Sequence, residues 1–138
     1  MSLNQELIRT RCEEIFDCLE RLEKIKESAR EEFIVNRDLQ DIASYRLLVA
    51  IEAALNLCFH VSAKKLKKAP GEYAECFGLL GDAGIIPGEL AGELKKMARF
   101  RNMLVHRYWK IDYEILFEIL HVNLDDLRCF TGIIAGLA

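Results

Sequence analysis

The sequence predicts an all-α protein, folded as a single up-and-down bundle of about five helices over residues 1–138. Apolar residues recur at helical spacing along almost the whole chain, and no stretch keeps the period-two alternation of a β-strand. Proline and glycine divide the chain into segments of helix length. Hydrophobic residues make up 51% of the chain, enough for a core without disulfides or metal, and no repeat or linker indicates a second domain.

The first helix is expected over about residues 3–34. Apolar residues recur there every seven positions, at Ile8, Ile15, Leu22 and Ala29. Asn36 and Asp38 are candidate N-caps for a second helix. That helix runs to the lysine cluster at residues 64–68, and Pro70-Gly71 ends it.

Three further helices follow. The third is short, carries Tyr73 on its apolar face, and ends at Gly81 and Gly84. Pro87 suits the first turn of a fourth helix, which runs to about residue 107. Asp112 can cap the fifth helix. Its apolar face is Leu116, Leu120, Leu124, Leu127 and Ile134.

Cysteine and histidine usage indicates a reducing compartment and no metal site. The five cysteines (Cys12, Cys18, Cys58, Cys76 and Cys129) are odd in number, form no C-x-x-C pair and sit among apolar neighbours, which is typical of small buried side chains. His60, His106 and His121 lack metal-ligand spacing; His60 is interpreted as structural and His121 as a surface residue. We see no secretory signal and no run near the ~20 apolar residues of a membrane span, so we expect a cytoplasmic protein.

Positive charge is concentrated in one segment. Between Lys95 and Lys110 there are six cations and no acid, and since the net charge is −3, the rest of the chain carries −9. Such a patch can focus a phosphate-bearing ligand. It can equally be a solvated helix whose cations complement its C-terminal dipole.

A polar stripe interrupts the otherwise apolar second helix. Glu52, Asn56 and His60 are spaced four apart and share one face. The stripe either lines a polar cleft or follows the solvent edge of the bundle.

Arg101 breaks the pattern of the fourth helix. Leu90, Leu94, Met97 and Leu104 form its apolar seam, and Arg101 occupies the missing position between the last two. An arginine in a buried face is costly unless it is paired or meets a charged ligand. The residue therefore belongs to a structural ion pair or to a site.

Asn102, His106 and Tyr108 follow closely and supply further chemistry. Histidine moves protons near neutral pH, and arginine stabilises charge on a phosphoryl group. With asparagine to position either of them, this set suits cleavage of RNA, in which the 2′-hydroxyl is the nucleophile and no metal is required. His106 lies about 140° around an ideal helix from Arg101, so the two would not touch on a straight helix.

Around these residues the sequence resembles the HEPN superfamily, and specifically the HepT-like toxins of prokaryotic toxin–antitoxin pairs. Their hallmark is arginine, a polar residue, three variable positions and histidine, followed by a spacer and tyrosine. Here it reads Arg101-Asn102-Met103-Leu104-Val105-His106-Arg107-Tyr108. The likeness covers about residues 5–130.

This resemblance implies a two-fold homodimer that brings both copies of Arg101 and His106 into one interface cleft. Members are metal-independent endoribonucleases that leave a 2′,3′-cyclic phosphate or an equivalent end, with no cofactor of their own. Arg101 would stabilise the transition state, His106 would act as acid or base, and Asn102 would orient the substrate or the histidine. Glu52 is a candidate partner of Arg101, and Asn56 lies one turn further along the same stripe.

The resemblance also implies a partner and a modification. In HepT-like pairs a minimal MntA-like nucleotidyltransferase antitoxin transfers AMP from ATP to the motif tyrosine, here Tyr108. Negative charge beside His106 would then oppose the substrate phosphate. The RNA substrate could be transfer RNA or messenger RNA.

Two other functions stay open. The chain could be a non-catalytic HEPN-type binding module that docks a nucleotidyltransferase, or a plain helical dimerisation protein in which the motif is structural. Intact Arg101 and His106 favour the enzyme.

Overall fold

The computed structural model describes residues 2–138. Within that range the regular elements are all helical, and there is no β-strand. The elements are α1 (Gln5–Lys26), α2 (Arg30–Val35), α3 (Arg37–Val61), a π-helical turn η1 (Ser62–Leu66), α4 (Tyr73–Asp82), α5 (Gly88–His106), a 3₁₀ turn η2 (Tyr108–Lys110), α6 (Tyr113–Val122) and α7 (Leu124–Leu137). The predicted all-α class is confirmed.

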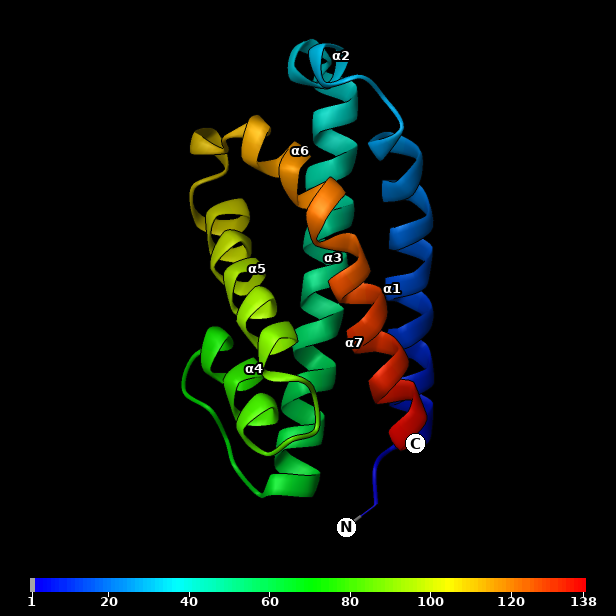
Figure 1. The fold of residues 1–138 in the computed structure, drawn as a ribbon, viewed down its shortest axis with the longest axis vertical. Helices are drawn as coiled ribbons and strands as arrows, with labels where there is room; N and C mark the ends of the chain where they lie inside the picture. Colours follow the sequence, from blue (N-terminus) through cyan, green and yellow to red (C-terminus); the bar gives the residue numbers. More distant parts are fainter. Residues whose placement is uncertain (1) are drawn as a thin grey trace.

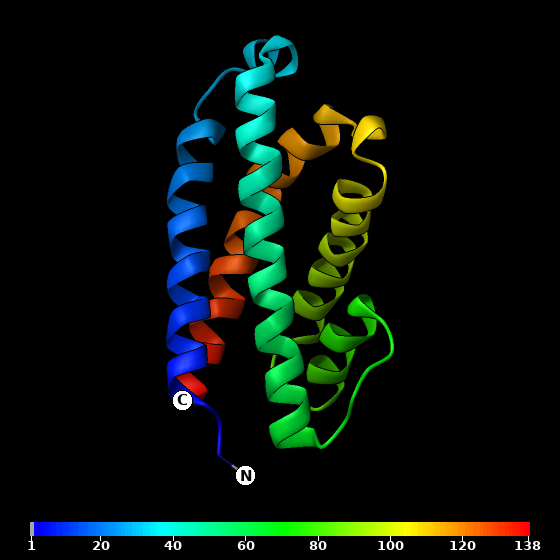
Figure 2. The same ribbon diagram turned by 180° about the vertical axis from the view of Figure 1, so that it is seen from behind.

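The long helices run alternately up and down around α3 (Figures 1 and 2). Helix α3 contacts α1 and α7 on one side and α4 and α5 on the other. The two termini lie at the same end of the bundle (Figure 1). The predicted up-and-down arrangement is confirmed, although two of the five predicted helices are each divided in two.

The first predicted helix is wrong beyond residue 26. Helix α1 ends at Lys26, and the short α2 crosses the top of the bundle (Figure 1). Ser28 donates its hydroxyl to the Ile25 carbonyl at 2.6 Å, and the buried amide of Gln40 donates to the carbonyls of Phe33 and Ile34 at 3.0 and 2.8 Å. These bonds satisfy carbonyls in the last turns of α1 and of α2, and hydrophobic periodicity cannot reveal them.

The fifth predicted helix is also divided, at Asn123. The buried Asn123 amide donates to Glu93 at 3.2 Å and to Asp126 at 2.9 Å. It thereby ties the junction of α6 and α7 to α5. Burial raises the pKa of Asp126, and the hydrogen bond from Asn123 opposes that shift.

Two predicted caps and the end of the second predicted helix are confirmed, and the start of the fourth needs correction. Asn36 caps α3 through the Leu39 N–H, and Asp112 caps α6 through the N–H groups of its second and third residues. The helical run from α3 ends at Leu66, within the predicted lysine cluster, and the next residue, Lys67, adopts a left-handed conformation (φ 55°). Pro87 precedes α5 as its N-cap residue instead of lying in its first turn.

The cysteines follow the prediction with one exception. Cys12, Cys18, Cys58 and Cys76 are buried free thiols, whereas Cys129 is exposed. Cys129 lies on the outer side of α7, so its apolar sequence neighbours did not indicate burial.

The central position of α3 explains its apolar composition. By length and composition, the helical run at residues 37–66 could cross a membrane, contrary to the expectation from sequence, because it contains an 18-residue stretch with a mean hydropathy of 1.5. Half of that stretch is buried within the bundle. This is the pattern of a core helix packed against neighbours on several sides.

Candidate active site

Arg101 lies on the inner side of α5, where its side chain is only 12% exposed. Its Nε donates to a carboxylate oxygen of Glu52 on α3. Its guanidinium also lies over the ring of Tyr73, the first residue of α4, with Cζ 4.4 Å from the ring centroid. One arginine thus connects three helices. The ion pair offsets the cost of placing a guanidinium in an apolar seam.

Asn102 belongs to the same hydrogen-bonded group. Its Oδ1 accepts from Nη1 of Arg101 at 3.1 Å. Because the amide oxygen is engaged, the amide –NH₂ is the group left to donate to a ligand. Asn102 also lines the neighbouring groove, so it connects Arg101 to that groove.

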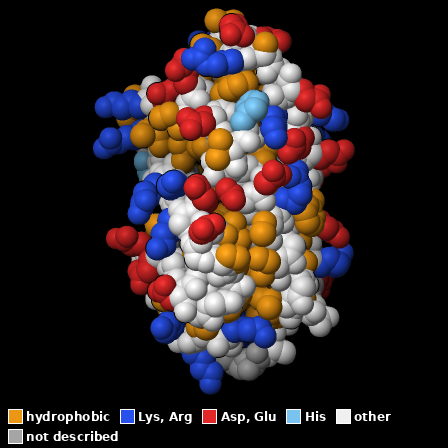
Figure 3. Space-filling view, in the orientation of Figure 1, with side chains coloured by type: hydrophobic (Ala, Val, Ile, Leu, Met, Phe, Trp, Pro, Cys, Tyr) orange, Lys and Arg blue, Asp and Glu red, His pale blue; other side chains and the backbone are white. Residues whose placement is uncertain are grey.

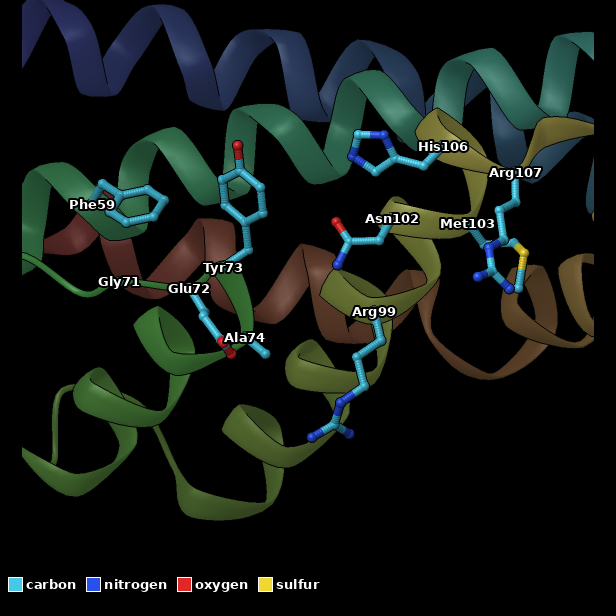
Figure 4. Close-up of a pocket in the computed structure, with 10 residues that line it drawn as sticks. All are labelled: Phe59, Gly71, Glu72, Tyr73, Ala74, Arg99, Asn102, Met103, His106 and Arg107. Atoms are coloured by element: carbon cyan, nitrogen blue, oxygen red, sulfur yellow. The ribbon is translucent and has the colours of Figure 1, made fainter.

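The groove runs between α5 and the segment leading into α4, with a volume of about 890 Å³. Its lining is Phe59, Gly71, Glu72, Tyr73, Ala74, Arg99, Asn102, Met103, His106 and Arg107. His106, in the last turn of α5, and Asn102 extend toward Tyr73 on the facing wall (Figure 4). A phosphate-bearing ligand in the groove would therefore meet an imidazole and an amide donor together.

Arg101 and His106 do not meet within one chain. Arg101 points toward α3, whereas the exposed His106 faces the groove, and no hydrogen bond between them is present among residues 2–138. This agrees with their angular separation on the helix. Asn102 lies between them, because it is hydrogen-bonded to Arg101 and lines the groove together with His106.

Tyr108 lies outside the groove, just past the end of α5. It is 67% exposed in η2 and packs edge-on against Trp109, with centroids 5.3 Å apart. It lines a smaller hollow of about 260 Å³ together with Tyr45 and Tyr113. The structure therefore separates the motif tyrosine from the groove that holds the motif histidine.

The polar stripe of α3 is divided between two neighbours. Glu52 faces α5, whereas Asn56 accepts from Nε of Arg11 on α1 at 2.9 Å. His60 Nε2 accepts the Asn4 backbone N–H at 3.0 Å. Burial, and secondarily the charge of Lys64, lowers the pKa of His60. Asn56 and His60 thus join α3 to the N-terminal segment, away from Arg101.

Sequence reasoning did not assign to the site five groove residues with aromatic or charged side chains: Phe59, Glu72, Tyr73, Arg99 and Arg107. Tyr73 was interpreted only as part of an apolar face. The one available signal was the cation-rich segment, because Arg99 and Arg107 belong to it. Neither arginine forms an ion pair with another residue of the described range, whereas Lys96 pairs with Glu93 at 3.5 Å. Lys and Arg side chains project along the edge formed by α5 (Figure 3).

A sequence model described as ribonuclease HepT-like matches residues 15–134. The chain belongs to the HepT-like ribonuclease family. The match includes all of α3, α4 and α5, and therefore Arg101 and the residues that contact it, Glu52, Tyr73 and Asn102.

Two HepT-like relatives share most of their length with this chain. It is 26% identical over 117 residues to an mRNA nuclease HepT from Shewanella oneidensis, covering 85% of this chain and 87% of the relative. It is 29% identical over 118 residues to a tRNA nuclease HepT from Aphanizomenon flos-aquae, covering 86% and 80%.

The HepT-like fold is also found among solved structures. One is a tri-AMPylated Shewanella oneidensis HEPN toxin in complex with an MNT antitoxin, with a TM-score of 0.87, 25% identity, and coverage of 97% of this chain and 99% of the toxin. The predicted HEPN-like bundle is therefore confirmed over nearly the full length. In the residues described here, no group of three or more His, Cys, Asp or Glu side chains is arranged to hold a metal ion.

Proposed function

We propose that this chain is a metal-independent endoribonuclease, the toxin of a toxin–antitoxin pair. The observation that carries the proposal is the intact HepT motif on α5, with its arginine held by Glu52 and Tyr73 and its histidine open to a groove. Relatives named as mRNA and tRNA nucleases support RNA as the substrate class.

The proposed reaction is transfer of the phosphodiester to the neighbouring 2′-oxygen. The 2′-oxygen forms a bond to phosphorus, the bond to the 5′-oxygen breaks, and a 2′,3′-cyclic phosphate and a 5′-hydroxyl result. A base takes the 2′-hydroxyl proton and an acid protonates the leaving oxygen; His106 supplies one of these roles. Arg101 stabilises the charge on the phosphoryl oxygens. The amide –NH₂ of Asn102 orients the phosphate.

We propose that the working form is a two-fold homodimer. Exposed apolar side chains lie near the motif on α3, α5 and η2, namely Ile42 (47% exposed), Val105 (37%) and Trp109 (66%). A second copy would cover these side chains. It would also bring a second Arg101 and His106 near the first pair. Arg101 of one chain could then lie close to His106 of the other, although the two residues do not meet within one chain.

We further propose that an MntA-like nucleotidyltransferase, using ATP, inactivates the protein at Tyr108. The phenolic oxygen would attack the α-phosphate, the bond to the β-phosphate would break, and pyrophosphate would leave. The exposure of Tyr108 makes its hydroxyl accessible to such a partner. The AMP-bearing toxin of Shewanella oneidensis, in complex with its MNT antitoxin, supports this part. A cytoplasmic location, where RNA and ATP are available, is part of this proposal.

A second candidate function is a non-catalytic module that docks the nucleotidyltransferase. The observation that favours it is the ion pair itself, because an arginine already neutralised by Glu52 meets a structural need without any substrate. The two functions differ in their dependence on His106, which is exposed and has no structural partner among the described side chains.

The deciding experiment is RNA cleavage in the presence of a chelator, by wild-type protein, Arg101→Ala and His106→Ala. We expect cleavage by the wild type alone, with cyclic phosphate ends. Folding and dimerisation of the variants are checked by circular dichroism and light scattering. Cleavage by folded His106→Ala would overturn the mechanism. If wild-type protein that carries no modification on Tyr108 fails to cleave RNA, that result would favour the docking module.

A further inference from the structure

The groove beside His106 has two chemically different walls. The wall from α3 and the segment entering α4 carries the aromatic rings of Phe59 and Tyr73 with the carboxylate of Glu72. The α5 wall carries the cations Arg99 and Arg107 with Asn102 and His106. Figure 4 shows these two sets of side chains on opposite sides of the groove.

The aromatic wall offers a surface for stacking. The rings of Phe59 and Tyr73 pack edge to face, with centroids 5.9 Å apart and an interplanar angle of 76°. Tyr73 is still 38% exposed although the Arg101 guanidinium covers part of it, and Phe59 is half-buried. Gly71 and Ala74, which also line this wall, add no bulky side chain beside the two rings.

Charge determines which way a nucleotide would lie. Phosphate is repelled by Glu72 on the aromatic wall and attracted by Arg99 and Arg107, which have no ion-pair partner within residues 2–138. A base, in contrast, is neutral and stacks on aromatic rings. A groove of about 890 Å³ is large enough for one nucleotide.

We propose that this groove is a nucleotide subsite that takes one unstacked base of single-stranded RNA against Phe59 and Tyr73, with the adjoining phosphate on Asn102, His106 and Arg107. The inference rests on the proposed ribonuclease function and deepens it, because it defines the substrate as single-stranded at the cleavage site. In a duplex the base would remain stacked within the helix and out of reach of this wall.

The test measures binding without cleavage. Full-length His106→Ala protein is titrated with a single-stranded RNA of about eight nucleotides, and with versions carrying one abasic site at each position. We expect one abasic position to weaken binding by about five- to fiftyfold. Adding Phe59→Leu should remove most of that penalty. Phe59 is chosen over Tyr73 because Tyr73 also contacts Arg101.

The matched control is Phe16→Leu in the same His106→Ala protein. Phe16 is a partly exposed phenylalanine (44%) on α1, outside the groove. This variant should keep the full abasic penalty. If Phe59→Leu does not fold, 5-iodouridine at the sensitive position provides a second measurement, since it should crosslink under light to Phe59 or Tyr73.

Wild-type cleavage of the unmodified RNA is followed in parallel. Equal binding of all abasic versions, a penalty that persists in folded Phe59→Leu, or crosslinks confined to other residues would overturn the subsite, even where the wild type cleaves RNA. Absence of both binding and cleavage would overturn the ribonuclease and the subsite together.

Discussion

The guanidinium of Arg101 lies 4.4 Å from the ring centroid of Tyr73, so the motif arginine of α5 is held against the first turn of α4. Glu52 fixes the same guanidinium from α3. Two contacts of different kinds therefore determine where the Arg101 head group lies, and each can be removed separately.

Removing the stacking contact should reduce activity through the position of Arg101. We expect Tyr73→Leu to lower kcat for RNA cleavage about tenfold or more, because an arginine displaced by about 1 Å stabilises the transition state poorly. Tyr73→Phe keeps the ring face and should stay within about threefold of wild type. Steady-state kinetics on both variants checks this. Equal activity of the leucine and phenylalanine variants would contradict it.

Removing the ion pair should have a larger effect. We expect Glu52→Ala to lower kcat about ten- to a hundredfold, and Glu52→Gln less, because glutamine can still accept from Nε of Arg101. Glu13→Gln is the control, since Glu13 pairs with Arg9 on the exposed face of α1. A Glu52→Ala enzyme with normal kcat and only a raised KM would show that Glu52 does not position the arginine.

Modification should map to the exposed tyrosine of η2. Incubation with an MntA-like nucleotidyltransferase and ATP should add AMP to wild type and to Tyr45→Phe, but not to Tyr108→Phe. Tyr45 is a suitable control because it is also exposed (60%) and lines the same hollow. Intact-mass and peptide mass spectrometry make the measurement. Mass gain by Tyr108→Phe would exclude this site.

His60 should make stability fall at acidic pH. Its pKa is lowered in the folded state, so below the usual value of 6.5 the unfolded chain binds the proton more readily. The stabilisation is complete above that value and is lost as the pH falls through the folded pKa. Protonation also removes the acceptor for the Asn4 N–H. The difference in Tm between about pH 7.5 and about pH 5.5 should be smaller in His60→Gln than in wild type. An unchanged difference would rule out this contribution.

Gly81 should be intolerant of a methyl group. A Cβ at this position of α4 would lie 2.7 Å from the Cβ of Ala91 on α5. We expect Gly81→Ala to lower the free energy of unfolding by about 1–3 kcal/mol. Gly132→Ala on α7, where nothing lies within 4 Å, should be neutral or stabilise by up to about 1 kcal/mol. Urea denaturation compares the two, and a Gly81→Ala protein as stable as wild type would contradict close packing of α4 on α5.

The sequence by itself determined the helical class, the order of the long helices and the caps at Asn36 and Asp112. These depend on hydrophobic periodicity and on side-chain bonds to nearby N–H groups, which act within a few residues. It also singled out Arg101, because a charge in an apolar seam is visible in the pattern alone.

Only the tertiary structure decided what surrounds that arginine. The partners of Arg101 on α3 and α4 lie 49 and 28 positions away in the chain, and no local rule relates such separations to contact. The same holds for the break at Asn123, which depends on Glu93 of α5. Packing of distant helices brings these groups together. The burial of apolar faces determines how the helices lie against one another, and that arrangement in turn determines which polar side chains come into contact.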